Sequence, residues 1–260
     1  MRNADISHTR PLMTAQDVPA ALGLLTRLPV RIDIDRATAR GAAAAWAFPL
    51  AGVVVAGITA LIGAFALWVG TPVMIVAGLI LAVQIVVTGA MHEDGLADSA
   101  DGLWGGWEIA RRLEIMKDSA IGTYGVLALG VSLLLRWAAL VAILSAGFLW
   151  APLIVVATVS RAPMVAMMAA LPNARAGGLS QSVGRPSGAT AALAGLIALA
   201  VTVVFLPWSA FAVLLVVALA GIACAVIAMA KIKGQTGDIL GATQQICEIA
   251  ALTVLAAHLG

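Results

Sequence analysis

Three aspartates lie three or four residues apart in the polar segment of residues 92–103. They are Asp94, Asp98 and Asp101. On an α-helix, at about 100° per residue, their side chains fall within roughly 60° of one another. Clustered carboxylates repel unless a cation compensates them, and Mg²⁺ commonly takes one or two carboxylates together with substrate phosphates. The spacing therefore predicts a Mg²⁺ site, with a solvated acidic helix end as the alternative. We expect the small residues between them, such as Gly95, to let a bulky ligand approach the backbone.

Two candidate catalytic residues come directly before this row. His92 and Glu93 resemble the start of a zinc-protease motif, but Leu96 stands where that motif needs its second histidine. His92 fits either a proton carrier or a plain interfacial histidine. Glu93 points roughly 100° away from the neighbouring Asp94 on a helix, so it fits either a base or an exposed acid.

Candidate substrate-binding residues follow in residues 111–125. Arg111 and Lys117 are the usual complement of a phosphate-bearing ligand, although bases here would also serve to keep the segment on one side of a membrane. Asp118 belongs to the same candidate group. Tyr124, the only tyrosine, fits either an interfacial anchor or a wall of the site.

Three more polar residues stand in or beside apolar stretches. Arg136 and Arg161 lie inside them, and because a buried charge in lipid is costly, they predict interior pairing or a polar cavity. Arg136 would equally fit a side chain that snorkels to the interface. Arg161 would also reach a substrate pocket. Asp238 would either join the aspartate site as a substrate-binding acid or cap the following helix.

The composition requires a membrane to position these residues. Of 260 residues, 62% are apolar and 11% are charged, and the mean hydropathy is +1.04. A soluble domain has about 45–50% apolar and about 25% charged residues. These values exclude a water-soluble enzyme, a disordered chain and a nucleic-acid binder, which would need a concentrated basic surface.

Apolar stretches of about 20 residues, the length of a membrane-crossing helix, recur along the chain. These stretches form three pairs, and a very short joint connects the two members of each pair. Such joints predict tight helical hairpins. Lipid offers no partner to an open sheet edge, so we expect an all-α polytopic integral membrane bundle of about six to seven transmembrane helices. Residues 18–30 and 246–259 would span, re-enter or lie at the interface. The candidate spans are residues 43–66, 72–91, 126–146, 150–171, 189–206 and 208–230.

The basic residues predict the orientation. Thirteen of the fifteen Lys and Arg lie in residues 1–40, 92–125, 172–188 and 231–246, and none lies in a tight joint. By the positive-inside rule these polar segments are cytoplasmic. We expect residues 1–260 to form one integral membrane domain whose cytoplasmic active-site loops are the last three of these segments.

Together, metal-binding carboxylates, phosphate-binding bases and a membrane-embedded chain indicate phosphoryl transfer. In that chemistry the protein mainly positions the reacting groups and neutralises the charge that develops. A divalent-cation transporter is a different class, but it would need polar groups through the bilayer, and the spans carry few of them.

The same segments resemble the cobalamin synthase family, the adenosylcobinamide-GDP ribazoletransferases. The resemblance runs in order from about residue 20 to the end of the chain. It rests on HEDGLADSADGL at 92–103, RRLEIMKDSAIGTYG at 111–125, SRAPM at 160–164 and TGDILGA at 236–242.

The resemblance implies a reaction and a setting. A ribose hydroxyl of α-ribazole, or of its 5′-phosphate, would attack adenosylcobinamide-GDP and release GMP, with Mg²⁺ required. The enzyme would be a multi-pass protein of the bacterial cytoplasmic (inner) membrane, as a homo-oligomer or with other cobalamin-pathway enzymes. In the matching positions, metal would be held by Asp94, Asp98 and Asp101, phosphate would be met by Lys117 and Arg111, and the site would be closed by Asp238.

One departure from the family pattern and one alternative family matter here. We expect an acid in relatives near Gln244 and Gln245, where this chain has two amides, which leaves Glu248 as the only acid further along the last helix. The alternative is a phospholipid-synthesising CDP-alcohol phosphotransferase, whose aspartate motif has Ala-Arg where this chain has Asp98 and Ser99. In addition, Asp101 follows Asp98 by only three residues, where that motif has a wider spacing, and this disfavours the alternative.

Overall fold

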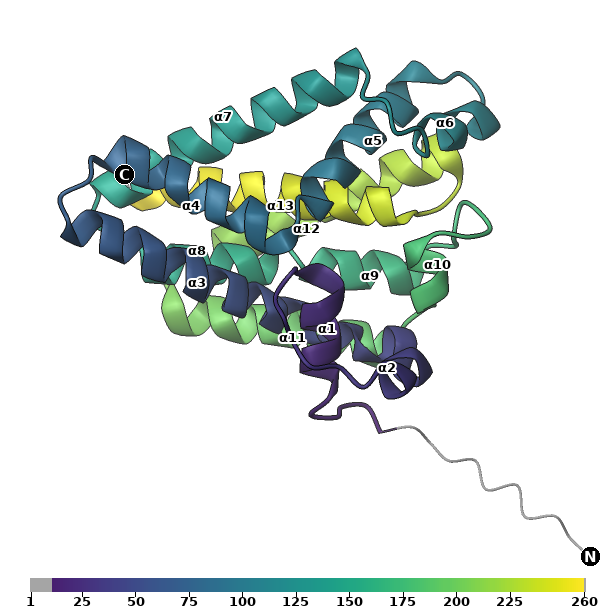
Figure 1. Cartoon of the computed structure of the whole chain (residues 1–260), viewed down its shortest axis with the longest axis horizontal. Helices are drawn as coiled ribbons and strands as arrows, with labels where there is room; N and C mark the ends of the chain where they lie inside the picture. The colour runs from purple at the N-terminus through teal and green to yellow at the C-terminus, as the bar shows by residue number, and fades with distance from the viewer. Residues whose placement is uncertain (1–10, 260) are drawn as a thin grey trace, which may run out of the picture.

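The computed structural model describes residues 11–259, which form helices joined by turns and short loops (Figure 1). This part of the chain contains no strand, only an isolated bridge between Asn173 and Gln235. The all-α prediction is therefore confirmed. In chain order, the helices are α1 (Asp17–Leu25), α2 (Ile34–Arg40), the 3-10 helix η1 (Gly41–Ala47), α3 (Phe48–Trp68), α4 (Val73–Thr88), α5 (Met91–Gly105), α6 (Ile109–Ile115), α7 (Thr123–Ser145), α8 (Trp150–Val159), α9 (Ala162–Ala170), α10 (Leu179–Val183), α11 (Gly188–Phe205), α12 (Ala210–Ile232) and α13 (Gly237–Leu259).

Six helical stretches of the described residues are long and apolar enough to cross a membrane, and the number is seven if the bent pair α4 and α5 counts as one span. The predicted polytopic bundle of six to seven helices is confirmed. The six stretches are Ile34–Trp68, Thr123–Ser145, Trp150–Ala170, Gly188–Phe205, Ala210–Ile232 and Gly237–Leu259.

The tight joints also lie where they were predicted, between α3 and α4, α7 and α8, and α11 and α12. Gly70 and Gly147 turn the first two with φ of +83° and +84°, values that glycine adopts without strain. Figure 1 shows the α3–α4 joint and the end of α13 at one end of the bundle, and α2, α6 and α10 at the other. Exposed aromatic residues such as Trp68 and Trp208 mark the joint end, as membrane interfaces favour.

The sequence left open whether residues 18–30 and 246–259 cross the membrane, and the structure differs between the two segments. Residues 18–30 contain only the nine-residue α1, which is too short to span. Residues 246–259 belong to α13, a 23-residue candidate span. The predicted polar loop of residues 231–246 is therefore shorter than expected, because the helix already begins at Gly237. The Thr236 hydroxyl accepts a hydrogen bond from the Ile239 amide at 3.3 Å and so caps this start.

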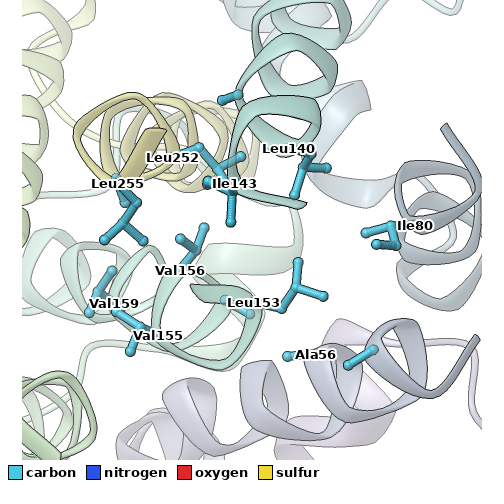
Figure 2. Packing of buried hydrophobic residues seen from close by; sticks show 14 of the residues in the cluster. Ala56, Ile80, Leu140, Ile143, Leu153, Val155, Val156, Val159, Leu252 and Leu255 are labelled. Carbon is cyan, nitrogen blue, oxygen red and sulfur yellow. The ribbon is translucent and has the colours of Figure 1, made fainter. Parts of the chain in front are cut away.

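The apolar core forms around α8, between α3, α4, α7 and α13 (Figure 2). Val155 and Val156 on α8 are almost fully buried there, against Ile143 of α7 and Leu255 of α13. This core lies toward the joint end of the bundle and holds the five helices in one arrangement. The polar residues are therefore positioned by a rigid scaffold.

An 88° bend between α4 and α5 directs the aspartate-bearing helix across the bundle. Gly89 and Ala90 both take left-handed backbone conformations there, with φ of +65° and +57°. Such a conformation costs a non-glycine residue about 1–2 kcal/mol, so Ala90 is strained. The Ala90 amide donates to the Ile85 carbonyl at 2.9 Å and closes the end of α4.

Candidate active site

Four aspartates form a cluster, which we call the aspartate cluster, between α5 and the first turn of α13. Asp98 of α5 is half-buried and is repelled by the carboxylates of Asp94, Asp238 and Asp101. The structure thus brings together the three aspartates predicted on one helix face and adds Asp238 from a segment more than 130 residues away.

Two glycines bring α5 and α13 close enough for this cluster. A Cβ atom on Gly95 would lie 2.7 Å from the carbonyl oxygen of Asp238, and a Cβ atom on Gly241 would lie 3.3 Å from the Cα atom of His92. The expectation that Gly95 leaves room for a ligand is therefore wrong. Its missing side chain makes room for the backbone of α13, which places Asp238 opposite α5.

Asp101 has a structural function that sequence reasoning missed. Its Oδ2 atom accepts a hydrogen bond from the Gly122 amide at 2.7 Å, and its Oδ1 atom accepts one from the Gly125 amide at 2.9 Å. These amides begin α7, so the carboxylate caps that helix from outside and interacts favourably with its dipole. Asp101 joins the aspartate cluster with both oxygens already engaged.

Arg175 is the cation that faces the aspartate cluster, although the sequence suggested only a topological role for it. Its Nη2 atom lies 3.0 Å from Oδ2 of Asp238, and it attracts Asp98. Asp238 also accepts a hydrogen bond from the Thr236 hydroxyl at 3.2 Å. Its position as one of two arginines in the glycine- and serine-rich segment of residues 172–188 was the only signal that could have indicated it.

The other predicted phosphate-binding residues lie at the surface. Arg111 is exposed and pairs with Glu114 at 2.7 Å, an ion pair that raises the pKa of this arginine. Lys117, Asp118 and Tyr124 are exposed as well. The structure does not bring their side chains into the aspartate cluster, and their substrate-binding roles stay predictions.

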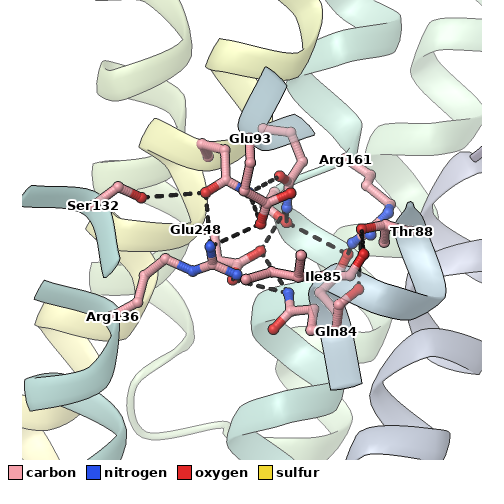
Figure 3. Close-up of polar contacts among 12 residues, drawn as sticks. Gln84, Ile85, Thr88, Glu93, Ser132, Arg136, Arg161 and Glu248 are labelled. Carbon is pink, nitrogen blue, oxygen red and sulfur yellow. Dashed lines mark hydrogen bonds and ion pairs between the residues drawn. The ribbon is translucent and has the colours of Figure 1, made fainter. Parts of the chain in front are cut away.

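His92 and Glu93 are both buried, and Figure 3 shows Glu93 among the polar side chains inside the bundle. Glu93 is buried and accepts a hydrogen bond from Nη1 of Arg136 at 2.9 Å. Nε2 of His92 is buried and has no hydrogen-bond partner among the described residues. Both residues therefore lie apart from the aspartate cluster, and their catalytic roles stay predictions.

Arg136 is the centre of a buried polar network, which links α4, α5, α7 and α13. Besides Glu93, it contacts Oε1 of Glu248 at 2.8 Å and Oε1 of Gln245 at 2.9 Å. Glu248 also accepts hydrogen bonds from Gln84 of α4 at 2.9 Å. Interior pairing of Arg136 is confirmed, and Glu248, the acid further along the last helix, is one of its buried partners.

Arg161 lies at the edge of the same network. It is fully buried, and its Nη1 atom donates to the carbonyl of Ala157 at 2.6 Å. Glu248 and Glu93 both attract it. The structure does not place Arg161 in the aspartate cluster, so its predicted contact with substrate stays a prediction.

The two amides that depart from the expected family pattern also belong to the network. Gln244 donates to Glu248 at 2.6 Å, and Gln245 donates to Glu93 at 3.2 Å. An acid at either position would face another carboxylate at hydrogen-bond distance. The amides instead supply donors to buried carboxylates, which would otherwise be costly to leave unsatisfied.

The aspartate cluster fits a hard divalent cation in its chemistry. Its donors are carboxylate oxygens, which Mg²⁺ prefers. Among the described residues, Arg175 is the only attractive charge acting on Asp98, against three repulsive ones. Within residues 11–259, no three His, Cys, Asp or Glu side chains already converge on a metal-sized space. The residues that would hold Mg²⁺ are Asp94 and Asp98, with Asp238 facing them from α13. The predicted role of Asp101 as a metal ligand stays a prediction, and its oxygens also cap α7.

Comparisons with known proteins match nearly the whole chain. The family model described as cobalamin-5-phosphate synthase matches residues 17–256. Proteins named adenosylcobinamide-GDP ribazoletransferase are similar in sequence: that of Bradyrhizobium diazoefficiens is 43% identical over 93% of both chains, and that of Allorhizobium ampelinum is 42% identical over 92% of this chain and 96% of its own. That of Mesorhizobium japonicum is 40% identical over 94% of both chains. No solved structure matches this chain.

The matched region includes every helix that forms the aspartate cluster and the buried polar network. It leaves out only the beginning of the chain and its last few residues. On this coverage and identity, the chain belongs to the cobalamin-5-phosphate synthase family.

Proposed function

We propose that this protein is an adenosylcobinamide-GDP ribazoletransferase that requires Mg²⁺ and acts in the bacterial inner membrane, with its active site at the cytoplasmic end of the bundle. The observation that carries the proposal is the aspartate cluster, which α5 and α13 form in a chain that matches this family from residue 17 to residue 256.

The reaction joins an alcohol to a phosphorus atom. A ribose hydroxyl oxygen that is free in both α-ribazole and its 5′-phosphate, and so is not the 5′ oxygen, forms a bond to the cobinamide-side phosphorus of adenosylcobinamide-GDP. The bond from that phosphorus to the bridging oxygen breaks, GMP leaves, and adenosylcobalamin or its 5′-phosphate remains. A carboxylate of the aspartate cluster takes the proton of the attacking hydroxyl, as in general base catalysis.

The side chains of the site divide the remaining tasks. When bound, Mg²⁺ supplies positive charge that stabilises the diphosphate and the departing phosphate. Asp94, Asp98 and Asp238 orient it and hold the substrate beside α5. Arg111 and Lys117 lie in residues 92–125, the polar segment that also carries Asp94 and Asp98. Their positive charges attract the negatively charged nucleotide toward the site.

The location follows from the charges and the apolar helices. Basic residues cluster in the polar segments and are missing from the tight joints, which puts those segments in the cytoplasm by the positive-inside rule. The lipid bilayer surrounds the helices, and the water-soluble substrates reach the site from the cytoplasm.

A direct assay tests the proposal. Purified protein in nanodiscs, supplied with adenosylcobinamide-GDP, α-ribazole and Mg²⁺, is expected to release GMP, and omission of Mg²⁺ is expected to stop it. CDP-diacylglycerol as the only nucleotide substrate should give no product, and liposomes should show no metal flux. Product from CDP-diacylglycerol would favour the lipid enzyme, and flux without GMP release would favour a transporter.

A variant of the aspartate cluster connects the activity to the site. Asp98→Asn keeps the size of the side chain but removes its charge, so we expect GMP release to fall by about 10²–10⁴-fold. Asp33→Asn is the matched control, because Asp33 is an exposed acid paired only with the nearby Arg36. Near-normal turnover of Asp98→Asn at saturating Mg²⁺ would exclude Asp98 from the site.

A further inference from the structure

Arg175 is partly buried and has an incomplete set of hydrogen-bond partners. Its side chain is 15% exposed, and its ion pair with Asp238 joins Nη2 to Oδ2 at 3.0 Å. Its Nη1 atom is buried without a hydrogen-bond partner among the described residues. An unsatisfied buried donor on a charged group is costly, so this arrangement leaves the guanidinium with unused binding capacity next to the aspartate cluster.

The backbone around Arg175 is anchored on one side and adaptable on the other. The Gln235 amide donates to the Pro172 carbonyl at 2.8 Å, and the Ala174 amide donates to the Gln235 carbonyl at 2.9 Å. After Arg175, Gly177 and Gly178 take φ of +99° and +97°, values that few other residues adopt. The anchor keeps the guanidinium at the start of α13, while the glycines give the following chain conformational freedom.

The charges of the site favour an exchange of partners. Within the described part of the chain, Arg175 is the one attractive charge acting on Asp98, and it also occupies one oxygen of Asp238. A divalent cation bound by the same carboxylates would repel the guanidinium. The phosphates of a substrate would attract it, because the planar fork of arginine binds phosphate oxygens bidentately.

We propose that Arg175 is a placeholder cation, which pairs with Asp238 while the site is empty and transfers to the diphosphate of the substrate when metal and nucleotide bind. This inference rests on the proposed function and deepens it, since it makes Arg175 a substrate-binding residue of the same site. No covalent bond changes in this step: the Arg175–Asp238 ion pair is exchanged for an arginine–phosphate pair and a carboxylate–metal contact.

The proposal predicts opposite effects of one substitution on two ligands. In the full-length protein in nanodiscs, Mn²⁺ binding without nucleotide is measured by the loss of its electron paramagnetic resonance signal. Arg175→Gln should bind Mn²⁺ about three- to tenfold more tightly, because a competing cation is gone. The KM for adenosylcobinamide-GDP should rise about 10- to 100-fold, because a charged hydrogen bond to phosphate is lost.

Two further variants make the test specific. Arg175→Lys keeps the charge but not the fork, so Mn²⁺ affinity should stay near that of the unsubstituted protein while KM still rises. Arg185→Gln is the matched control on the same loop: Arg185 donates to the carbonyls of Ala169 and Ala170 and pairs with no carboxylate among the described residues. It should change neither quantity.

The outcomes separate this inference from the proposed function. Unchanged or weaker Mn²⁺ binding by Arg175→Gln overturns it, and so does an unchanged KM in both Arg175 variants. If Arg175→Gln does not fold, a KM for Arg175→Lys equal to that of the unsubstituted protein overturns it. An unsubstituted protein that neither binds Mn²⁺ nor releases GMP would instead refute the proposed function itself.

Discussion

Replacing Arg136 with methionine is expected to destabilise this protein more than any replacement of a surface arginine. Arg136 is fully buried, and its guanidinium contacts the carboxylates of Glu93 at 2.9 Å and of Glu248 at 2.8 Å (Figure 3). Methionine fills a similar length without charge. Arg136→Met therefore leaves two carboxylates in the bundle interior, and Arg161 still attracts both.

The magnitude follows from the cost of leaving a buried charge unpaired. Removing one partner of a buried ion pair costs about 3–5 kcal/mol. For a protein of this size, about 1 kcal/mol corresponds to roughly 2–4 °C in Tm, so Tm should fall by about 6–20 °C. Thermal unfolding in detergent, followed by circular dichroism, measures the change.

A second substitution tests the cause of the loss. In Arg136→Met with Glu93→Gln, the remaining charges are Glu248 and Arg161, which attract each other. A charge-balanced interior without the original ion pair is often nearly as stable, so the double variant should recover at least half of the lost Tm. This rescue would not occur if Arg136 stabilised the protein only by filling space.

The control is an arginine in an exposed ion pair. Arg36 and Asp33 lie 3.1 Å apart, with side chains 66% and 49% exposed. Arg36→Met should change the stability by at most about 1 kcal/mol. A Tm of Arg136→Met equal to that of Arg36→Met, or a double variant no more stable than the single one, would refute the reasoning.

Three other predictions follow from the geometry of the site. Gly95→Ala should separate α5 from α13 and lower GMP release while membrane insertion persists, whereas Gly130→Ala, whose new Cβ would meet nothing within 4 Å, should change neither; equal activities would contradict the close crossing. Asp101→Ala removes the cap of α7 and should lower the stability by about 1–2 kcal/mol in chemical unfolding; an unchanged midpoint would show that the cap contributes nothing. Burial alone would raise the pKa of Asp17, but hydrogen bonds from Arg40, Trp46 and Thr14 outweigh it and lower the pKa below 3.8. The ionised carboxylate therefore stabilises the folded protein at neutral pH, and this stabilisation is lost as the pH falls through the folded-state pKa of Asp17. The Tm difference between Asp17→Asn and the unsubstituted protein should accordingly shrink below about pH 4. A Tm difference that does not depend on pH would contradict this assignment.

Much of the fold could be predicted because each feature depends on neighbours in the sequence. A run of about 20 apolar residues is a transmembrane helix wherever it occurs, and a joint of a few residues forces the next helix to return. The helical spacing of Asp94, Asp98 and Asp101 likewise depends only on local geometry. The last helix was harder to predict, because Glu248, Gln244 and Gln245 make part of it polar, and only buried partners on other helices make those residues compatible with a span.

The candidate site was predicted only in part, because some of its contacts join residues that are far apart in the sequence. Asp238 was named from its motif, but its place opposite Asp98 depends on two glycines that let α5 and α13 cross closely. No spacing along the chain indicates that Arg175 reaches Asp238, or that Asp101 caps a helix more than 20 residues later.

The sequence by itself determined that this chain is a helical membrane protein with an acidic row and a polar side, because hydrophobicity and helical periodicity act over a few residues. Only the tertiary structure decided which polar groups serve the site and which stabilise the interior. His92, Glu93 and Asp94 are consecutive, yet the first two face the bundle interior and the third the aspartate cluster. The direction in which a helix faces is set by the helices packed against it, and those come from distant parts of the chain.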